Sequence, residues 1–141
     1  MLNYIPIIFR CEFGPQNGFG HLMRCVALAE GFQKYPQIKT FLITNSFRKK
    51  FTNFFKGSGI EVISLSQKTS GLGFDLGDYT DHPYESIMLF DNYDVTEEEM
   101  TEYKKKYPNL VAIDDFADRC FNIDIIINQN IQAEKLHSRF F

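Results

Sequence analysis

The feature that most constrains the fold is the alternation of short, continuously apolar runs with longer amphipathic segments. Strands that are apolar along most of their length are typical of a parallel sheet covered on both faces. The pattern predicts an α/β fold: a Rossmann-like parallel sheet with helices on both faces. The expected strands are Tyr4–Phe9, Lys39–Thr44, Glu61–Leu65, Ser86–Phe90, Leu110–Ile113 and Asp124–Ile127. The expected helices are Gly20–Tyr35, Ser46–Lys56 and Thr96–Tyr107.

Length and composition indicate one domain over residues 1–141, because 141 residues with 44% apolar side chains fill a single core. No apolar run approaches the roughly 20 residues of a membrane span. The net charge is −3, and the basic residues are scattered, with no stripe of the kind that nucleic-acid binding needs. The N-terminus lacks the basic region and small-residue cleavage site of a signal peptide.

Cys11, Cys25 and Cys120 are three in number and have no C-x-x-C spacing. This argues against a disulfide framework or a zinc site, and no metal is expected. We interpret all three as small apolar side chains of a protein in the reducing cytoplasm.

Local signals support the helix boundaries. Thr96 and Glu99 have the spacing of a capping box. Ser46 can cap the second helix. The segment Ser66–Thr80 is rich in Ser, Gly, Thr and Asp and is interpreted as a loop.

Polar residues follow the apolar runs, and in an open parallel sheet the carboxyl edge of the strands is where ligands bind. Strand ends that meet water are also polar in general, which explains the polarity but less well the clustering of Asp and Asn. The residues concerned are Arg10, Thr44-Asn45, Asp91, Asp114-Asp115 and Asn128-Gln129-Asn130.

The stretch NGFGHLMRC, residues 17–25, joins the first expected strand to the first helix. Gly14, Gly18 and Gly20 allow sharp turns and a close approach to a ligand, and the helix N-terminus behind them favours an anion. The stretch fits neither a dinucleotide fingerprint, since Met23 holds the third glycine position, nor a Walker loop.

His21 lies in the first turn of this helix, where the helix dipole disfavours a cation. A neutral imidazole can accept a proton from water, so His21 is suited to act as a general base. Spacing alone fits equally well a His21 that only packs against the loop. Arg24, three residues on, is either a fixed charge in a cleft or one half of a surface salt bridge. His82 is expected to be structural, and His137 solvated.

Several motifs in order resemble the PseG family, the UDP-2,4-diacetamido-2,4,6-trideoxy-β-L-altropyranose hydrolases of pseudaminic acid synthesis, which are related to SpsG-type spore-coat polysaccharide proteins. The resemblance spans nearly the whole chain. It implies the N-terminal half of a glycosyltransferase-B-type, MurG-like architecture. The motifs are Phe9-Arg10, Gly18 to Cys25, Asp91 to Tyr93, Asp114-Asp115 and Asn128 to Asn130.

The resemblance also implies an activity. Water attacks the anomeric carbon of a UDP-sugar without a metal or another cofactor, and His21 is the catalytic base. Family members are roughly twice as long as this chain, so the nucleotide-binding half is expected on a C-terminal partner, or self-association takes its place. The residues expected to bind substrate are Arg10, Gly18, Gly20, Arg24, Asp91, Tyr93, Asn128 and Asn130.

Two alternatives stay open from the sequence. A glycosyltransferase of the same architecture would transfer the sugar to a hydroxyl acceptor instead of water. A non-catalytic sugar-binding or interaction module would keep the fold and lose the chemistry.

Overall fold

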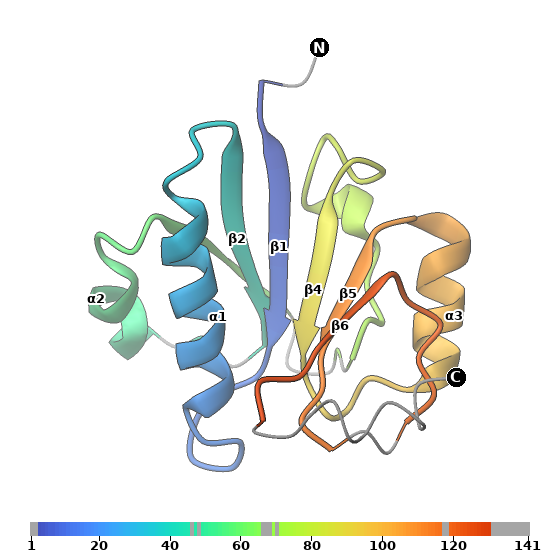
Figure 1. The fold of residues 1–141 in the computed structure, drawn as a ribbon. Helices are drawn as coiled ribbons and strands as arrows, with labels where there is room; N and C mark the ends of the chain where they lie inside the picture. The colour runs from blue at the N-terminus through green and yellow to red at the C-terminus, as the bar shows by residue number, and fades with distance from the viewer. Residues whose placement is uncertain are drawn as a thin grey trace.

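In a computed structural model that describes residues 3–45, 47, 49–65, 69, 71–116 and 119–130, the chain forms a six-stranded, fully parallel sheet with helices on both faces (Figure 1). This confirms the expected Rossmann-like α/β fold. The strands are β1 Ile5–Cys11, β2 Ile38–Thr44, β3 Ile60–Ser64, β4 Ile87–Asp91, β5 Leu110–Ile113 and β6 Ile125–Ile127. The helices are α1 Gly20–Phe32, α2 Thr52–Phe55 and α3 Glu97–Lys106, with 3₁₀ turns η1 Lys49–Phe51 and η2 Leu76–Asp78.

In the strand order β3-β2-β1-β4-β5-β6, the direction in which successive strands are added to the sheet reverses between β1 and β4. The chain first moves outward from β1 to β3 and then returns to the other side of β1. At this switch point the loops that follow β1 and β4 diverge, which leaves a crevice at the carboxyl edge of the sheet. The order therefore predicts where a ligand would bind.

Successive residues of each strand point to opposite faces of the sheet and thereby build two apolar layers. Ile7, Phe9 and Cys11 of β1 pack in one layer with Leu22 and other residues of α1. Ile8 packs in the other layer, with Met100 and Tyr103 of α3. The parity of a residue in its strand thus decides which helix it meets.

The predicted strands are all present, with ends shifted by up to two residues. β1 continues to Cys11 because Arg10 and Cys11 still pair with Phe90 and Asp91 of β4. Helix α1 ends at Phe32, three residues earlier than expected, in keeping with the low α-helical preference of a residue that precedes proline, here Tyr35.

The second predicted helix, Ser46–Lys56, is only partly correct. The chain forms the 3₁₀ turn η1 and then the single turn α2. Ser46, the expected cap, lies outside the described residues. The predicted loop Ser66–Thr80 is also more structured than expected, because it contains η2 and buries Leu72 and Leu76 in the α3 layer.

Two of the three cysteines behave as predicted. Cys11 and Cys25 are buried in the α1 layer, and the hydrogen bond with Cys11 together with burial raises the pKa of the Cys25 thiol. Cys120 is exposed, so its interpretation as an apolar core residue is wrong. Within the described residues, no helix is long and apolar enough to cross a bilayer.

The predicted capping box of α3 is present, and its Glu99 side chain also binds a second segment of the chain. The Thr96 side chain accepts from Glu99 N, and the Glu99 carboxylate accepts from Thr96 N at 2.9 Å. The same carboxylate accepts from Leu72 N at 3.2 Å. Glu99 therefore joins the start of α3 to the connection between β3 and β4.

Replacing Glu99 with alanine removes acceptors from two backbone N–H groups, so Glu99→Ala should lower the free energy of unfolding by about 1–2 kcal/mol. Urea denaturation measures the loss. Glu98→Ala, at the exposed neighbouring position of the same helix turn, is the matched control and should change stability by no more than about 0.5 kcal/mol. Equal losses in the two variants would contradict the double role of Glu99.

Candidate active site

Strand parity brings three polar residues to the α1 side of the carboxyl edge. Asp91 lies two positions after Leu89, and Asp115 lies two positions after Ile113. Leu89 and Ile113 are apolar residues of the α1 layer. Gln129 follows Ile127 in the same way. Because side chains alternate along a strand, these residues are placed toward the start of α1.

The start of α1 is set by a glycine turn. Gly14 and Gly18 exchange both backbone hydrogen bonds, at 3.0 and 2.7 Å, and both have positive φ, at 128° and 70°. Such a turn tolerates few residues other than glycine. It reverses the chain directly after β1, so that Gly20 and His21 begin α1 over the switch point.

His21 forms a close pair with Asp91. The distance from His21 Nδ1 to Asp91 Oδ1 is 2.6 Å, and the Asp91 side chain is fully buried. An Asp91 carboxylate ionised by its pairing with Arg24 can only accept, so we assign the proton of this contact to Nδ1, although Arg24 Nη2, which can only donate, lies 3.1 Å from the same nitrogen. In the neutral ring, Nε2 is then the nitrogen with the free lone pair, on the side of the imidazole away from Asp91.

Arg24 binds both oxygens of the same carboxylate. Its Nε donates to Asp91 Oδ2 at 2.9 Å and its Nη2 to Asp91 Oδ1 at 2.8 Å. Its Nη1 donates to both oxygens of Asp115, at 2.7 and 2.6 Å. Burial lowers the pKa of Arg24, but the hydrogen bonds to Asp115 and Asp91 outweigh it and raise the pKa above its usual value. The guanidinium is a fixed charge held by two carboxylates.

Tyr93 completes the group from the loop after β4. Its ring meets the His21 ring edge-on, with centroids 4.7 Å apart, and its hydroxyl donates to Asp115 Oδ2 at 3.1 Å. Partial burial, followed by the hydrogen bond to Asp115, raises the pKa of Tyr93, so the hydroxyl keeps its proton at neutral pH. The ring also packs against Phe116, at 5.0 Å between centroids.

These side chains border a pocket of about 310 Å³ at the switch point. Its lining residues are Asn17, Gly20, His21, Arg24, Tyr93, Asp115 and Gln129. Among them Arg24 carries the permanent positive charge, and two carboxylates already compensate it. The pocket therefore offers a histidine nitrogen and hydrogen-bonding groups, but no uncompensated cation from the described residues that line it.

Five of the predicted site residues line this pocket or support it from within the protein. His21, Gly20, Arg24 and Tyr93 line it, and Asp91 lies beneath His21 and Arg24. The expectation that Arg24 is a charge in a cleft fits this arrangement better than a surface salt bridge, because 17% of its side chain is exposed.

The other predicted residues do not line the pocket. Gly18 holds the turn, and Asn130 Nδ2 donates to the backbone oxygen of Asp115 at 2.8 Å. Asn128 has the opposite strand parity to Gln129, which lines the pocket in its place.

Arg10 lies on the other face of the sheet. It follows Ile8 by two positions and thus belongs to the α3 side, where it is completely buried and forms an ion pair with Glu12. Its Nε donates to Gly71 O at 2.8 Å. Arg10 therefore fastens the connection between β3 and β4 to the end of β1, instead of contacting the pocket.

Three residues of the pocket were not among the individual site residues predicted from the sequence: Asn17, Asp115 and Gln129. The motif Asp114-Asp115 was noted, but which of the two acids faces the pocket follows from parity with Val111 and Ile113. Asp114 instead lies 3.4 Å from Arg119 Nη2. Counting strand parity from the apolar residues would have selected Asp115 and Gln129.

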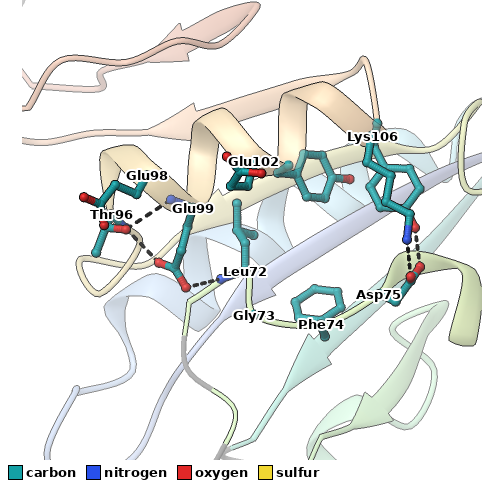
Figure 2. Close-up of a pocket in the computed structure, with 11 residues that line it drawn as sticks. Leu72, Gly73, Phe74, Asp75, Thr96, Glu98, Glu99, Glu102 and Lys106 are labelled. Atoms are coloured by element: carbon teal, nitrogen blue, oxygen red, sulfur yellow. Dashed lines mark hydrogen bonds and ion pairs between the residues drawn. The ribbon is translucent and has the colours of Figure 1, made fainter.

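A second and larger pocket of about 500 Å³ lies between α3 and the segment 72–75 (Figure 2). Figure 2 shows Glu99 reaching back to Thr96 and Leu72 at one end, and Lys106 directed to Asp75 at the other. Glu99, Lys106 and Asp75 are occupied in these contacts, and the pocket lining holds no histidine. Among the described residues, no group of His, Cys, Asp and Glu side chains could hold a metal ion. We therefore place the candidate chemistry in the pocket of His21.

Removing the charge of Arg24 leaves the buried Asp91 carboxylate with His21 as its remaining side-chain partner. Arg24→Met should therefore lower the free energy of unfolding by about 3 kcal/mol, since breaking a buried ion pair leaves an uncompensated charge. Urea denaturation of Lys105→Met, which removes an exposed pair with Glu102, is the control and should show little change. A loss as small as that of the control would show that Asp91 does not depend on Arg24.

Asp75 at the second pocket provides a pH-dependent contact. Hydrogen bonds from Lys106, Tyr107 and Gly77 N lower its pKa from 3.8 to about 2. A carboxyl group with a lowered pKa stabilises the fold above its unfolded pKa and loses this contribution as the pH falls through the folded one. The stability difference between the wild type and Asp75→Asn should thus be complete above pH 4 and disappear near pH 2. Carboxyl-carbon NMR of Asp75 tests it directly, and titration near pH 4 would contradict it.

Comparison with known proteins adds no further assignment. No family model matches the chain, and the searches of curated proteins and of solved structures return no significant match. The pocket is therefore interpreted from its own geometry and from the sequence motifs that contribute to it.

Proposed function

We propose that this chain is the catalytic half of a UDP-sugar hydrolase of surface-polysaccharide biosynthesis, acting at the anomeric carbon. The observation that carries the proposal is the contact between His21 Nδ1 and Asp91, which leaves Nε2 free to take a proton at the switch point of the sheet. The substrate class comes from the resemblance to the PseG family. Its pathway, pseudaminic acid synthesis or a related one in the cytoplasm, belongs to the same proposal.

In the proposed reaction His21 Nε2 accepts a proton from a water molecule while the water oxygen bonds to the anomeric carbon. The bond between this carbon and the β-phosphate oxygen breaks, and UDP leaves with the electron pair. Asp91 compensates the charge of the imidazolium and keeps the ring oriented. His21 then returns the proton to solvent, so the enzyme is unchanged after each turnover.

The roles of the neighbouring residues differ from those expected by resemblance. Arg24 is bound on both sides by Asp91 and Asp115, so we assign it to holding Asp91 in place. Tyr93, with 45% of its surface exposed, can offer its ring and its hydroxyl oxygen to a sugar. Gln129 and Asn17 provide amide groups that suit sugar hydroxyls. Arg10 has no part in this scheme.

The charge of the pocket supports the expectation that a nucleotide-binding half is required. A UDP diphosphate is strongly anionic, and the positive charge of Arg24 is already compensated. Another element must therefore neutralise the leaving group. A nucleotide-binding half, arranged as in a glycosyltransferase-B-type enzyme, fits this requirement and is part of the proposal.

The test mixes the chain with the separately produced C-terminal domain of a PseG-family hydrolase and measures UDP release from a panel of UDP-sugars. The panel includes UDP-2,4-diacetamido-2,4,6-trideoxy-β-L-altropyranose. His21→Ala should reduce the rate by a factor of roughly 10² to 10⁴, the usual contribution of a general base. His82→Ala, which removes a histidine that packs edge-on against Tyr4, is the matched control and should retain the rate.

Isotope labelling checks which bond breaks. In ¹⁸O-labelled water, attack at the anomeric carbon gives unlabelled UDP, whereas attack at phosphorus gives labelled UDP. Full activity of His21→Ala, or labelled UDP, would refute the mechanism. A new glycoside in place of free sugar would assign the site to a glycosyltransferase instead.

A further inference from the structure

The charges of the chain are distributed unevenly, although its basic residues are scattered along the sequence as a whole. The 30 residues between Glu30 and Glu61 contain no acidic residue. Their six basic residues are Lys34, Lys39, Arg48, Lys49, Lys50 and Lys56. In a chain of net charge −3, this segment is locally cationic.

Three of these lysines lie together around η1 and α2. Lys49, Lys50 and Lys56 are exposed, and none of them forms an ion pair with another described residue. Lys39 differs, because it binds Glu61 at 2.9 Å. Figure 1 shows α2 at the outer side of α1, with α3 at the other end of the sheet.

Phenylalanine side chains connect this corner to the core. Phe13 and Phe55 are buried, and Phe51 packs edge-on against Phe13 at 5.2 Å between ring centroids. This series of ring contacts reaches the surface at two residues. The ring centroid of Phe19 lies 5.9 Å from that of Phe51, and the ring centroid of Phe54 lies 5.2 Å from that of Phe55. Phe19 and Phe54 are 45% and 46% exposed.

We propose that this basic-aromatic patch, formed by Lys49, Lys50, Lys56, Phe19 and Phe54, binds the surface of a membrane that contains anionic lipids. Lysines near such a surface are attracted by its negative potential, and apolar rings insert below the headgroups. The buried ring of Phe13 packs against Phe19, and the buried ring of Phe55 packs against Phe54. The two exposed rings are therefore already held in place, and little side-chain freedom is lost on binding.

The composition of the patch favours a lipid surface over a nucleic acid. Lysine contacts phosphate as a point charge, while Phe54 has no hydrogen-bonding group that could read a base. The lysines also lie within eight residues, 49–56, rather than along a groove that follows several nucleotides.

The patch adjoins the candidate active site, because Phe19 directly precedes Gly20, which lines the pocket of His21. A chain bound through this patch would hold that pocket close to the membrane. The inference itself uses no catalytic residue, so it stands or falls independently of the proposed hydrolase activity.

Vesicle flotation tests the proposal with the full chain, comparing phosphatidylcholine vesicles with vesicles that contain 30% phosphatidylserine. We expect binding to the anionic vesicles to be at least tenfold stronger and to weaken as salt rises. Lys49→Gln/Lys50→Gln should reduce the partition coefficient roughly 30-fold, which corresponds to about 1 kcal/mol per lysine. Phe54→Ser should reduce it roughly tenfold, through lost apolar burial.

Matched controls lie on the α3 side of the molecule. Lys105→Gln/Lys106→Gln removes two exposed charges, and Tyr84→Ser removes a ring that is 61% exposed. Both should bind the vesicles like the wild type, and thermal unfolding verifies that every variant is folded. The proposal is overturned by equal losses in patch and control variants, by absent binding at low salt, or by tighter binding of a polyuridine oligonucleotide than of the vesicles.

Discussion

The site depends on the contacts of the buried Asp91 carboxylate, which pairs with His21 through one oxygen and with Arg24 through both. A fully buried acid requires compensation, and Arg24 provides it. The same contact orients the ring of His21. One ion pair thus stabilises the edge of the sheet and at the same time prepares the histidine for accepting a proton.

The position of this contact follows from the order of the strands. Since β1 and β4 are neighbours, the loop before α1 and the end of β4 meet at the switch point, although His21 and Asp91 are 70 residues apart in sequence. The α1 layer supplies the apolar base of the site. The α3 side contains a second ionic pair, in which Arg10 binds Glu12 and also donates to the backbone oxygen of Gly71.

Much of the architecture could be predicted because it depends on local patterns. The continuous apolar runs identified each strand, and Thr96 with Glu99 identified the start of α3. Helix α2 was less predictable, since four phenylalanines in Ser46–Lys56 suggested a long apolar helix face where only one helical turn forms. Their rings instead extend a cluster that begins at Phe13, which no local pattern reveals.

By itself, the sequence determined that the fold is α/β and parallel. It proposed His21, Arg24, Asp91 and Tyr93 as site residues, together with Arg10, Gly18, Gly20, Asn128 and Asn130. These conclusions depend on periodicity, glycine spacing and motif order, which are properties of neighbouring residues. Only the tertiary structure decided that Arg10 belongs to the opposite face, and that Asp115 and Gln129 join the pocket. The physical reason is that a strand alternates its side chains between two faces, and the pairing of distant strands decides which residues share a face.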